Sequence, residues 1–350
     1  MKKIILVMMV ILSGALYSQA KSEPAHTYED LFYLRSVSAR MEATGLTGVT
    51  YNNWDNPAAD YNESISFKFN YSNNPNYYDD GAYYFFDAGF SPIKNFRVNL
   101  AYENLSHDYY LFEFDENKEN NTVTKLSVNS KILDNLFFGI SGNYYFYKND
   151  SNVTDVNGEE LASEVKKTYW TVDFGALYEY TNSDIPNQKL TFAASYQNAI
   201  QTDLELEPSK LSYDNELPAI LKLGTTWNLF NNDDNWMADY NLKLHYQYRT
   251  LTDSSLRDMN SFGLEYTQYD MLTARLGYYI DDEAKDDGQF TYGFGIAIPF
   301  NKFDNLKSIP LEIRLDYAHL DINQSEEGFT FEGRENETFD TFGIELRYNL

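Results

Sequence analysis

Strict alternation of apolar and charged residues is the feature that most constrains how this chain folds. The pattern is clearest in 64–71, 240–249 and 311–317. In the last of these, one face carries Leu311, Ile313, Leu315 and Tyr317, and the other carries Glu312, Arg314 and Asp316. A period of two residues is typical of a β-strand. A face this charged would leave many buried charges in a β-sandwich core, but it can line the polar lumen of a transmembrane barrel whose apolar face meets lipid.

The first twenty residues have the organisation of a secretory signal peptide. Lys2 and Lys3 supply the positive start, the apolar run 4–16 follows, and Ser18-Gln19-Ala20 forms a small-x-small cleavage site. We therefore expect an exported protein. No later stretch approaches the ~18 consecutive apolar residues of a membrane-spanning helix. The chain has no cysteine, which excludes disulfides, thiol nucleophiles and cysteine-based metal sites.

Composition favours a barrel with aromatic rims. The chain contains 31 Tyr and 24 Phe, although its mean hydropathy is −0.53. Aromatic belts at the two membrane interfaces explain this combination. The net charge of −26 argues against nucleic acid as a partner, because its phosphates would be repelled. Acidic residues gather in segments such as 115–116, 281–283 and 326–327. We interpret these either as solvated loops or as contacts, through divalent cations, with anionic lipid of the outer leaflet.

Short and long connections alternate along the chain and predict the number of strands. Short turns are predicted at 91–95, 132–135, 181–187, 230–237, 268–271 and 300–309. Longer polar loops are predicted at 72–81, 105–120, 149–165, 201–216, 251–258, 281–288 and 321–337. These thirteen connections separate fourteen antiparallel strands, and the even number places both ends of the barrel on the periplasmic side. The run 109–112 is interpreted as part of a loop, because an additional strand would spoil the parity.

The last ten residues form an alternating strand that resembles the C-terminal assembly signal of bacterial outer-membrane barrels. The match consists of a polar residue, a glycine and two spaced apolar residues: Thr341, Gly343, Leu346 and Tyr348. That signal usually ends on Phe or Trp, whereas this chain ends on Leu350. The resemblance implies a location in the bacterial outer membrane, insertion by the barrel-assembly machinery, and contact with outer-membrane lipid and lipopolysaccharide.

The segment before the first strand, 21–61, carries a second resemblance. It contains, in order, Ser38-Ala39-Arg40, Gly45, Gly48, Trp54 and Asn56-Pro57-Ala58. This pattern is similar to the N-terminal segment of FadL-type outer-membrane transport barrels, especially their PorV/PorQ-like branch. Further fragments, such as 217–227 and 262–280, follow in the family's order. Two departures are that Asp55 splits the family's Trp-Asn-Pro-Ala and that Ala59 replaces its usual Leu.

In FadL-like proteins this segment is a hatch inside the barrel. A fourteen-stranded barrel is also too wide for side chains alone to fill. We therefore predict an all-β protein with a signal peptide (1–20), an N-terminal plug or hatch (21–61) and a 14-stranded antiparallel transmembrane β-barrel (62–350). The resemblance marks as ligand or gating residues Gly45, Gly48, Trp54, Asn56, Pro57 and Ala58. Alternatively, Asn56-Pro57-Ala58 is only a turn leading into the first strand.

Candidates for catalysis are few. The four His, at 26, 107, 245 and 319, show no metal-ligand spacing, and no G-x-S-x-G elbow accompanies them. We expect no enzyme, cofactor or metal. The inward faces instead collect both signs of charge, including Lys68, Asp87, Glu265 and Arg275. We interpret these charges either as an ion-pair network between plug and wall or as a lining that selects polar solutes. The residues assigned to this lumen network are Arg314, Asp316, Glu345, Arg347, Lys243 and Arg249.

Three functions are compatible with these observations. The first is passive uptake of hydrophobic or amphipathic small molecules, which would bind an apolar site between plug and wall. The second, closer to the PorV-like branch, is an outer-membrane component of type IX protein secretion that binds exported proteins. The third is a structural or adhesive barrel that acts through its acidic loops. Fold and function are separable, so the sequence leaves all three open.

The predicted topology can be tested by labelling. A cysteine introduced into 149–165 or 321–337 should react with an impermeant maleimide on intact cells, because those loops are expected to face outside. A cysteine in 181–187 should react only after the outer membrane is permeabilised. Labelling of 181–187 on intact cells would overturn the predicted orientation.

Overall fold

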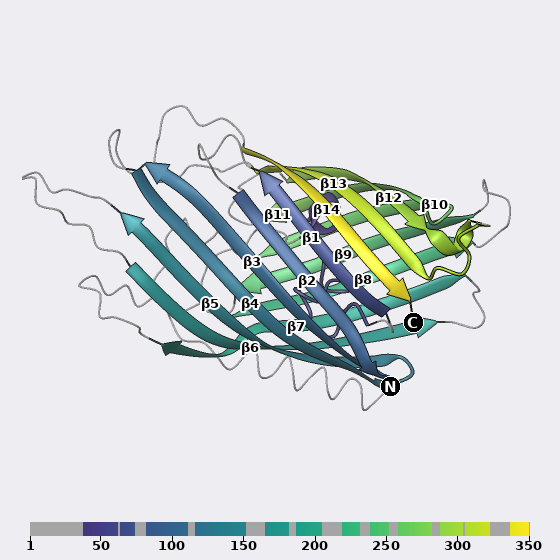
Figure 1. The fold of residues 1–350 in the computed structure, drawn as a ribbon, viewed down its shortest axis with the longest axis horizontal. Helices are drawn as coiled ribbons and strands as arrows, with labels where there is room; N and C mark the ends of the chain where they lie inside the picture. The colour runs from purple at the N-terminus through teal and green to yellow at the C-terminus, as the bar shows by residue number, and fades with distance from the viewer. Residues whose placement is uncertain are drawn as a thin grey trace, which may run out of the picture.

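The chain forms a closed antiparallel β-barrel of fourteen strands (Figure 1). Each strand pairs with its neighbours in sequence, and β1 closes the barrel against β14. This confirms the predicted all-β class and strand count. The computed structural model describes residues 38–61, 64–73, 82–110, 116–151, 165–181, 187–204, 219–231, 239–251, 258–281, 288–303, 305–322 and 337–349. No helix among them is long and apolar enough to cross a membrane.

The strands are β1 (Ser64–Asn73), β2 (Ala82–Ile93), β3 (Phe96–Tyr110), β4 (Glu116–Leu133), β5 (Leu136–Ser151), β6 (Val165–Thr181), β7 (Gln188–Leu204), β8 (Ile220–Asn231), β9 (Tyr240–Leu251), β10 (Met259–Gln268), β11 (Leu272–Asp281), β12 (Gln289–Pro299), β13 (Leu311–Ile322) and β14 (Glu337–Asn349). A short helix, α3 (Ala39–Ala43), precedes them, and the 3-10 turn η1 (Phe300–Lys302) follows β12. All thirteen connections fall where the alternation of turns and loops predicts them.

One loop prediction is wrong at both of its ends. The predicted loop 105–120 is mostly strand, because β3 continues to Tyr110 and β4 begins at Glu116. Tyr109 and Tyr110 lie opposite Asn117 and Glu116 in the ladder, so they extend β3. The barrel is taller on this side: β3 to β7 have 15 to 18 residues, whereas the other strands have 10 to 13. About 9–11 residues suffice to cross the bilayer, so the long strands project beyond it.

The two faces of the wall are those that the alternation predicts. Leu315 is 47% exposed, and Leu244 and Leu346 are each 38% exposed on the outer face. Arg97 and Glu265, which face the lumen, are at most 1% exposed. Large apolar side chains on the outside of a closed sheet are what a hydrocarbon solvent requires, because the backbone polar groups are already paired in the ladder.

The described part of the predicted plug, 38–61, runs through the inside of the barrel (purple in Figure 1). Helix α3 packs against β11, β12, β13 and β14. The rest of the segment forms hydrogen bonds with residues of β4, β6, β7, β8 and β9. The plug therefore meets the wall around most of its circumference. Residues 1–37, which include the predicted signal peptide and the first part of the predicted plug, lie outside the described residues.

Two pairs of wall glycines make room for the plug. Gly139 lies opposite Gly175 in the β5–β6 ladder, and a Cβ added to Gly139 would lie 2.2 Å from the backbone of Pro57. Gly263 lies opposite Gly277 in the β10–β11 ladder, and a Cβ on Gly277 would lie 1.9 Å from the nitrogen of Gly45. Glycine is required at these positions because two backbones approach closely.

The lipid-facing role of Leu315 yields a stability prediction. An Arg near the bilayer midplane costs about 2–4 kcal/mol, so Leu315→Arg should reduce the fraction of assembled, heat-modifiable barrel on gels. The control Leu315→Phe, which keeps an apolar side chain on the same face, should assemble like the parent protein. Equal assembly of the Arg and Phe variants would show that the outer face is assigned wrongly.

Candidate functional site

The plug begins with a capped helical turn. The hydroxyl of Ser38 accepts a hydrogen bond from the backbone nitrogen of Met41 at 3.2 Å, as an N-cap does. The helix ends at Gly45, whose φ of +68° favours glycine. A side chain at Gly45 would lie 2.7 Å from the carbonyl oxygen of Phe262. The backbone nitrogen of Gly45 donates to the hydroxyl of Thr291 at 3.0 Å. Gly45 therefore sets both the turn and its approach to the wall.

A glutamine of β9 holds the next turn of the plug. The Oε1 of Gln247 accepts hydrogen bonds from the backbone nitrogens of Gly48 and Val49, both at 2.9 Å. Its Nε2 donates to the carbonyl of Leu46 at 3.2 Å. Gln247 is 2% exposed, so this one side chain supplies the partners that water would otherwise supply to three buried backbone groups.

The Asn56-Pro57-Ala58 motif packs into the wall and is more than a turn before β1. The side chain of Asn56 donates to the carbonyls of Val49 at 2.9 Å and Ala176 at 3.2 Å. It accepts from the backbone nitrogen of Ala58 at 2.9 Å. Asn56 and Ala58 are fully buried, next to the glycine pair of β5 and β6. The motif thus links two parts of the plug to β6.

Trp54 anchors the plug against the opposite part of the wall. Its carbonyl accepts hydrogen bonds from Lys125 Nζ at 2.7 Å and from Gln197 Nε2 at 2.9 Å. Its ring packs edge-on against Phe85, with 5.5 Å between centroids. Lys125 also pairs with the buried Asp173 at 2.7 Å. Trp54 therefore joins an aromatic contact to a charged group of the wall.

A buried ion-pair cluster fastens the helical end of the plug. Arg40 donates two hydrogen bonds to Glu265 of β10, at 2.8 and 3.0 Å. The same carboxylate accepts from Lys243 of β9 at 2.6 Å and from Arg275 of β11 at 2.8 Å. Arg275 also pairs with Asp316 at 2.6 Å. Only one of the three cations on Glu265 belongs to the plug, so the carboxylate keeps two wall partners when Arg40 leaves.

A simpler ion pair fastens the middle of the plug. Asp55 accepts a hydrogen bond from Lys222 of β8 at 2.6 Å. Both side chains are at least nine-tenths buried. Lys222 lies opposite Arg249 in the β8–β9 ladder, so a like charge stands beside it. Loss of Asp55 would leave two neighbouring cations in the lumen without that carboxylate, which is expensive.

A third ion pair, between Asp60 and Lys68, fastens the end of the plug at β1. Burial by itself would raise the pKa of Asp60, but Lys68, Arg347 and Arg97 outweigh burial and lower this pKa to about 2. A carboxylate whose pKa is lowered on folding stabilises the folded state above its ordinary pKa of 3.8. This contribution is lost as the pH falls towards about 2, so the pair stays charged in mildly acidic surroundings.

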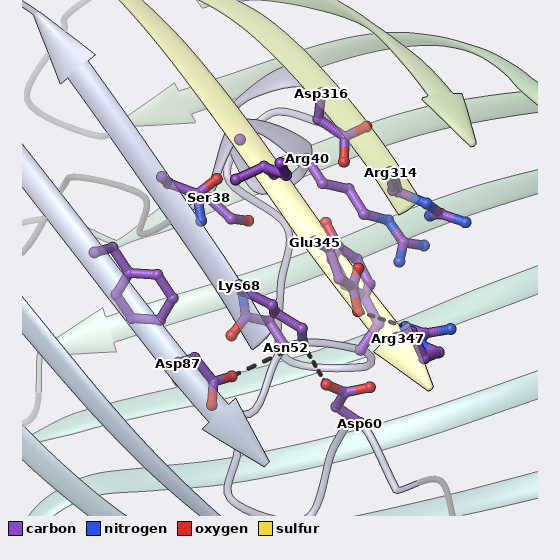
Figure 2. A pocket seen from close by; sticks show the side chains of 15 residues that line it. Ser38, Arg40, Asn52, Asp60, Lys68, Asp87, Arg314, Asp316, Glu345 and Arg347 are labelled. Carbon is purple, nitrogen blue, oxygen red and sulfur yellow. Dashed lines mark hydrogen bonds and ion pairs between the residues drawn. The ribbon is translucent and has the colours of Figure 1, made fainter. Parts of the chain in front are cut away.

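Four of the residues assigned to the lumen network line one pocket between the plug and β1, β2, β13 and β14: Arg314, Asp316, Glu345 and Arg347 (Figure 2). Arg314 lies opposite Glu345 in the ladder. The ion pairs run within each strand instead, from Arg314 to Glu312 at 3.3 Å and from Arg347 to Glu345 at 2.8 Å. Lys243 and Arg249 lie elsewhere, beside Glu265 and Lys222 respectively. The six residues therefore belong to three separate places on the wall.

Comparisons with known proteins bear on the fold. No protein-family model matches the chain, and no curated protein matches it. Three solved structures match it over most of its length. They are the Ralstonia pickettii toluene transporter TbuX (13% identity, 91% of this chain, 100% of that chain, TM-score 0.58), the monoaromatic hydrocarbon channel CymD (10%, 90%, 98%, 0.55) and the Pseudomonas putida toluene transporter TodX (13%, 95%, 100%, 0.54).

The chain has the fold of the FadL-type transport barrels. This confirms, at the level of fold, the resemblance that the plug motif carries, and it places the barrel among outer-membrane folds. The three matching proteins are described as transporters or channels, which agrees with the expectation that this chain is not an enzyme. Among the described residues, no three His, Asp or Glu side chains are grouped to hold a metal ion. The PorV-like branch stays a prediction.

Sequence reasoning missed the residues that fasten the plug. Arg40 is part of the Ser-Ala-Arg motif, but its partner Glu265 lies 225 positions away. Asp55 appears in the sequence only as an interruption of the family motif, whereas in the structure it is the partner of Lys222. The available signal was the presence of charged residues inside a segment expected to lie in the lumen, since such charges require partners on the wall.

The two fastenings should differ in strength. Asp55→Asn leaves Lys222 buried without its carboxylate, and removing one partner of a buried pair costs about 3–5 kcal/mol. Arg40→Gln leaves Glu265 with two cations. Hydrogen exchange of the plug amides, such as that of Asn56, should therefore accelerate more in Asp55→Asn than in Arg40→Gln. An equal or larger acceleration in Arg40→Gln would contradict this assignment.

Proposed function

We propose that this protein is an outer-membrane channel for the uptake of hydrophobic small molecules, with the segment 38–61 as its gate. The observation that carries the proposal is a plug that crosses the lumen and is fastened by three ion pairs, through Arg40, Asp55 and Asp60. The matching barrels are described as transporters of toluene and a channel for monoaromatic hydrocarbons. Monoaromatic hydrocarbons are therefore the first solutes to test.

Apolar contacts between plug and wall indicate where such a solute would pass. Met41 packs in a buried cluster with Tyr83, Phe85 and Ala101, and Trp54 lies against it. On another side, Leu46 packs with Met259, Tyr279 and Leu320. These contacts fill the space in which an apolar site was expected, so the plug itself occupies it. A hydrophobic solute could replace such contacts without desolvating a charge, whereas each ion pair would have to break or move with the plug.

The remaining parts of the sequence interpretation belong to the same proposal. Residues 1–20 would direct export, and 21–61 would form the complete plug. Acidic loops and the outer aromatic belt would contact lipid and lipopolysaccharide. The secretion and adhesion alternatives have no specific support among the described contacts, which are concentrated inside the barrel.

The gate can be tested by deletion. A variant without 38–58 keeps every strand and the C-terminal strand, so it should still assemble. In planar bilayers it should conduct ions, whereas the complete protein should conduct far less, because its lumen is filled. Equal conductance of the two would exclude the plug as the gate.

Solute uptake needs its own readout. Cells that carry the complete protein should take up radiolabelled toluene faster than cells that carry Leu315→Arg, the variant expected to assemble poorly. The assembling variant Leu315→Phe is the matched control and should support uptake like the parent. Absence of any difference among these cells would overturn the hydrocarbon channel while leaving the result of the conductance experiment intact.

A further inference from the structure

The pocket between the plug and the β1–β14 seam is strongly polar, unlike the solutes of the proposed channel. It lies towards the end of the barrel at which β1 begins and β14 ends, since Lys68 and Arg347 are close to those strand ends. Including its mouth, it encloses about 590 Å³. Figure 2 shows side chains from the plug and from three adjacent wall strands around it. A space of this size is within the range of small-molecule sites.

Charges of both signs line the pocket in equal number. The cations are Arg40, Lys68, Arg314 and Arg347, and the anions are Asp60, Asp87, Asp316 and Glu345. With four of each, the lining is neutral at pH 7 and would favour a solute with no net charge. Anions alone or cations alone would find as many repulsive as attractive groups.

Several polar atoms of this lining have no hydrogen-bond partner. They are Oδ1 of Asp87, Nε of Arg314 and Nε of Arg347. Asp87 is only 4% exposed, and its other oxygen is 3.8 Å from Lys68. Each arginine uses Nη2 for the carboxylate on its own strand, which leaves its Nε–H edge available. A buried acceptor and two buried donors without partners are costly unless something binds them.

We infer that this pocket binds a small zwitterion, a solute with one ammonium and one carboxylate group. The ammonium would donate to Asp87, and the carboxylate would accept from the Nε–H groups of Arg314 and Arg347. Charge-assisted hydrogen bonds of both kinds are stronger than neutral ones. Phe85 and Ile344 add a small apolar surface to the lining, enough for a short aliphatic side chain. The inference goes beyond the proposed channel, because it concerns a polar solute and does not require the plug to move.

The test uses L-alanine and two analogues that each lack one charge. Isothermal titration of the detergent-solubilised complete protein should show saturable binding of alanine at pH 7. Propionate, which lacks the ammonium group, and ethylamine, which lacks the carboxylate, should each bind at least tenfold more weakly, because each leaves one set of polar atoms without a partner. Equal binding of all three, or no binding of alanine, would overturn the inference and indicate a pocket filled by water.

Variants then separate a site from a general effect on the barrel. Asp87→Asn and Arg347→Gln keep the size and polarity of the side chains and should each weaken alanine binding about tenfold or more. Lys189→Gln is the matched control, since it removes one cation of a lumen-remote ion pair, that with Glu179, and it should bind alanine like the parent. Heat-modifiability shows that each variant is assembled. Unchanged binding in an assembled Asp87→Asn would exclude Asp87 as a ligand and overturn the site.

Discussion

The need to satisfy every backbone polar group within a membrane governs this structure. A sheet with open edges would leave unpaired donors and acceptors in hydrocarbon, so the fourteen strands close, and β1 pairs with β14 from Ser64–Asn349 to Asn73–Asp340. Closure also creates a lumen that is too wide for the wall side chains to fill. The plug, its glycine contacts and its ion pairs all follow from the filling of that space.

The filling is polar because the inner face of the wall is polar. Glu265, Asp173 and Arg275 lie at most 2% exposed, and charges that are removed from water require partners. Asp173 obtains them from the wall itself, since it accepts hydrogen bonds from Lys125, Ser141 and Asn143. Glu265 and Lys222 obtain them partly or wholly from the plug. The plug is therefore part of the electrostatic balance of the barrel as well as its obstruction.

This balance is uneven along the plug. At the helical end, Arg40 shares Glu265 with two wall cations, whereas Asp55 is the partner of Lys222 beside a second cation. The helical end can thus leave its place at a lower electrostatic cost than the segment around Asp55. The polar pocket borders that same end, because Ser38 and Arg40 line it. A bound polar solute and the position of Arg40 would therefore influence each other through shared charges.

The sequence by itself determined the strands, their number and the face that each residue presents. A period of two needs only neighbouring residues, and the alternation of short and long connections sets the topology. Local patterns also marked Gly45 and Asn56-Pro57-Ala58 as special positions. Only the tertiary structure decided which charges meet. The pairs Arg40–Glu265 and Asp55–Lys222 join positions 225 and 167 residues apart, and the path of the plug selects them. The failed single network of six charges has the same cause: residues that share the inward face are distributed around the circumference, and position on a face does not specify a partner.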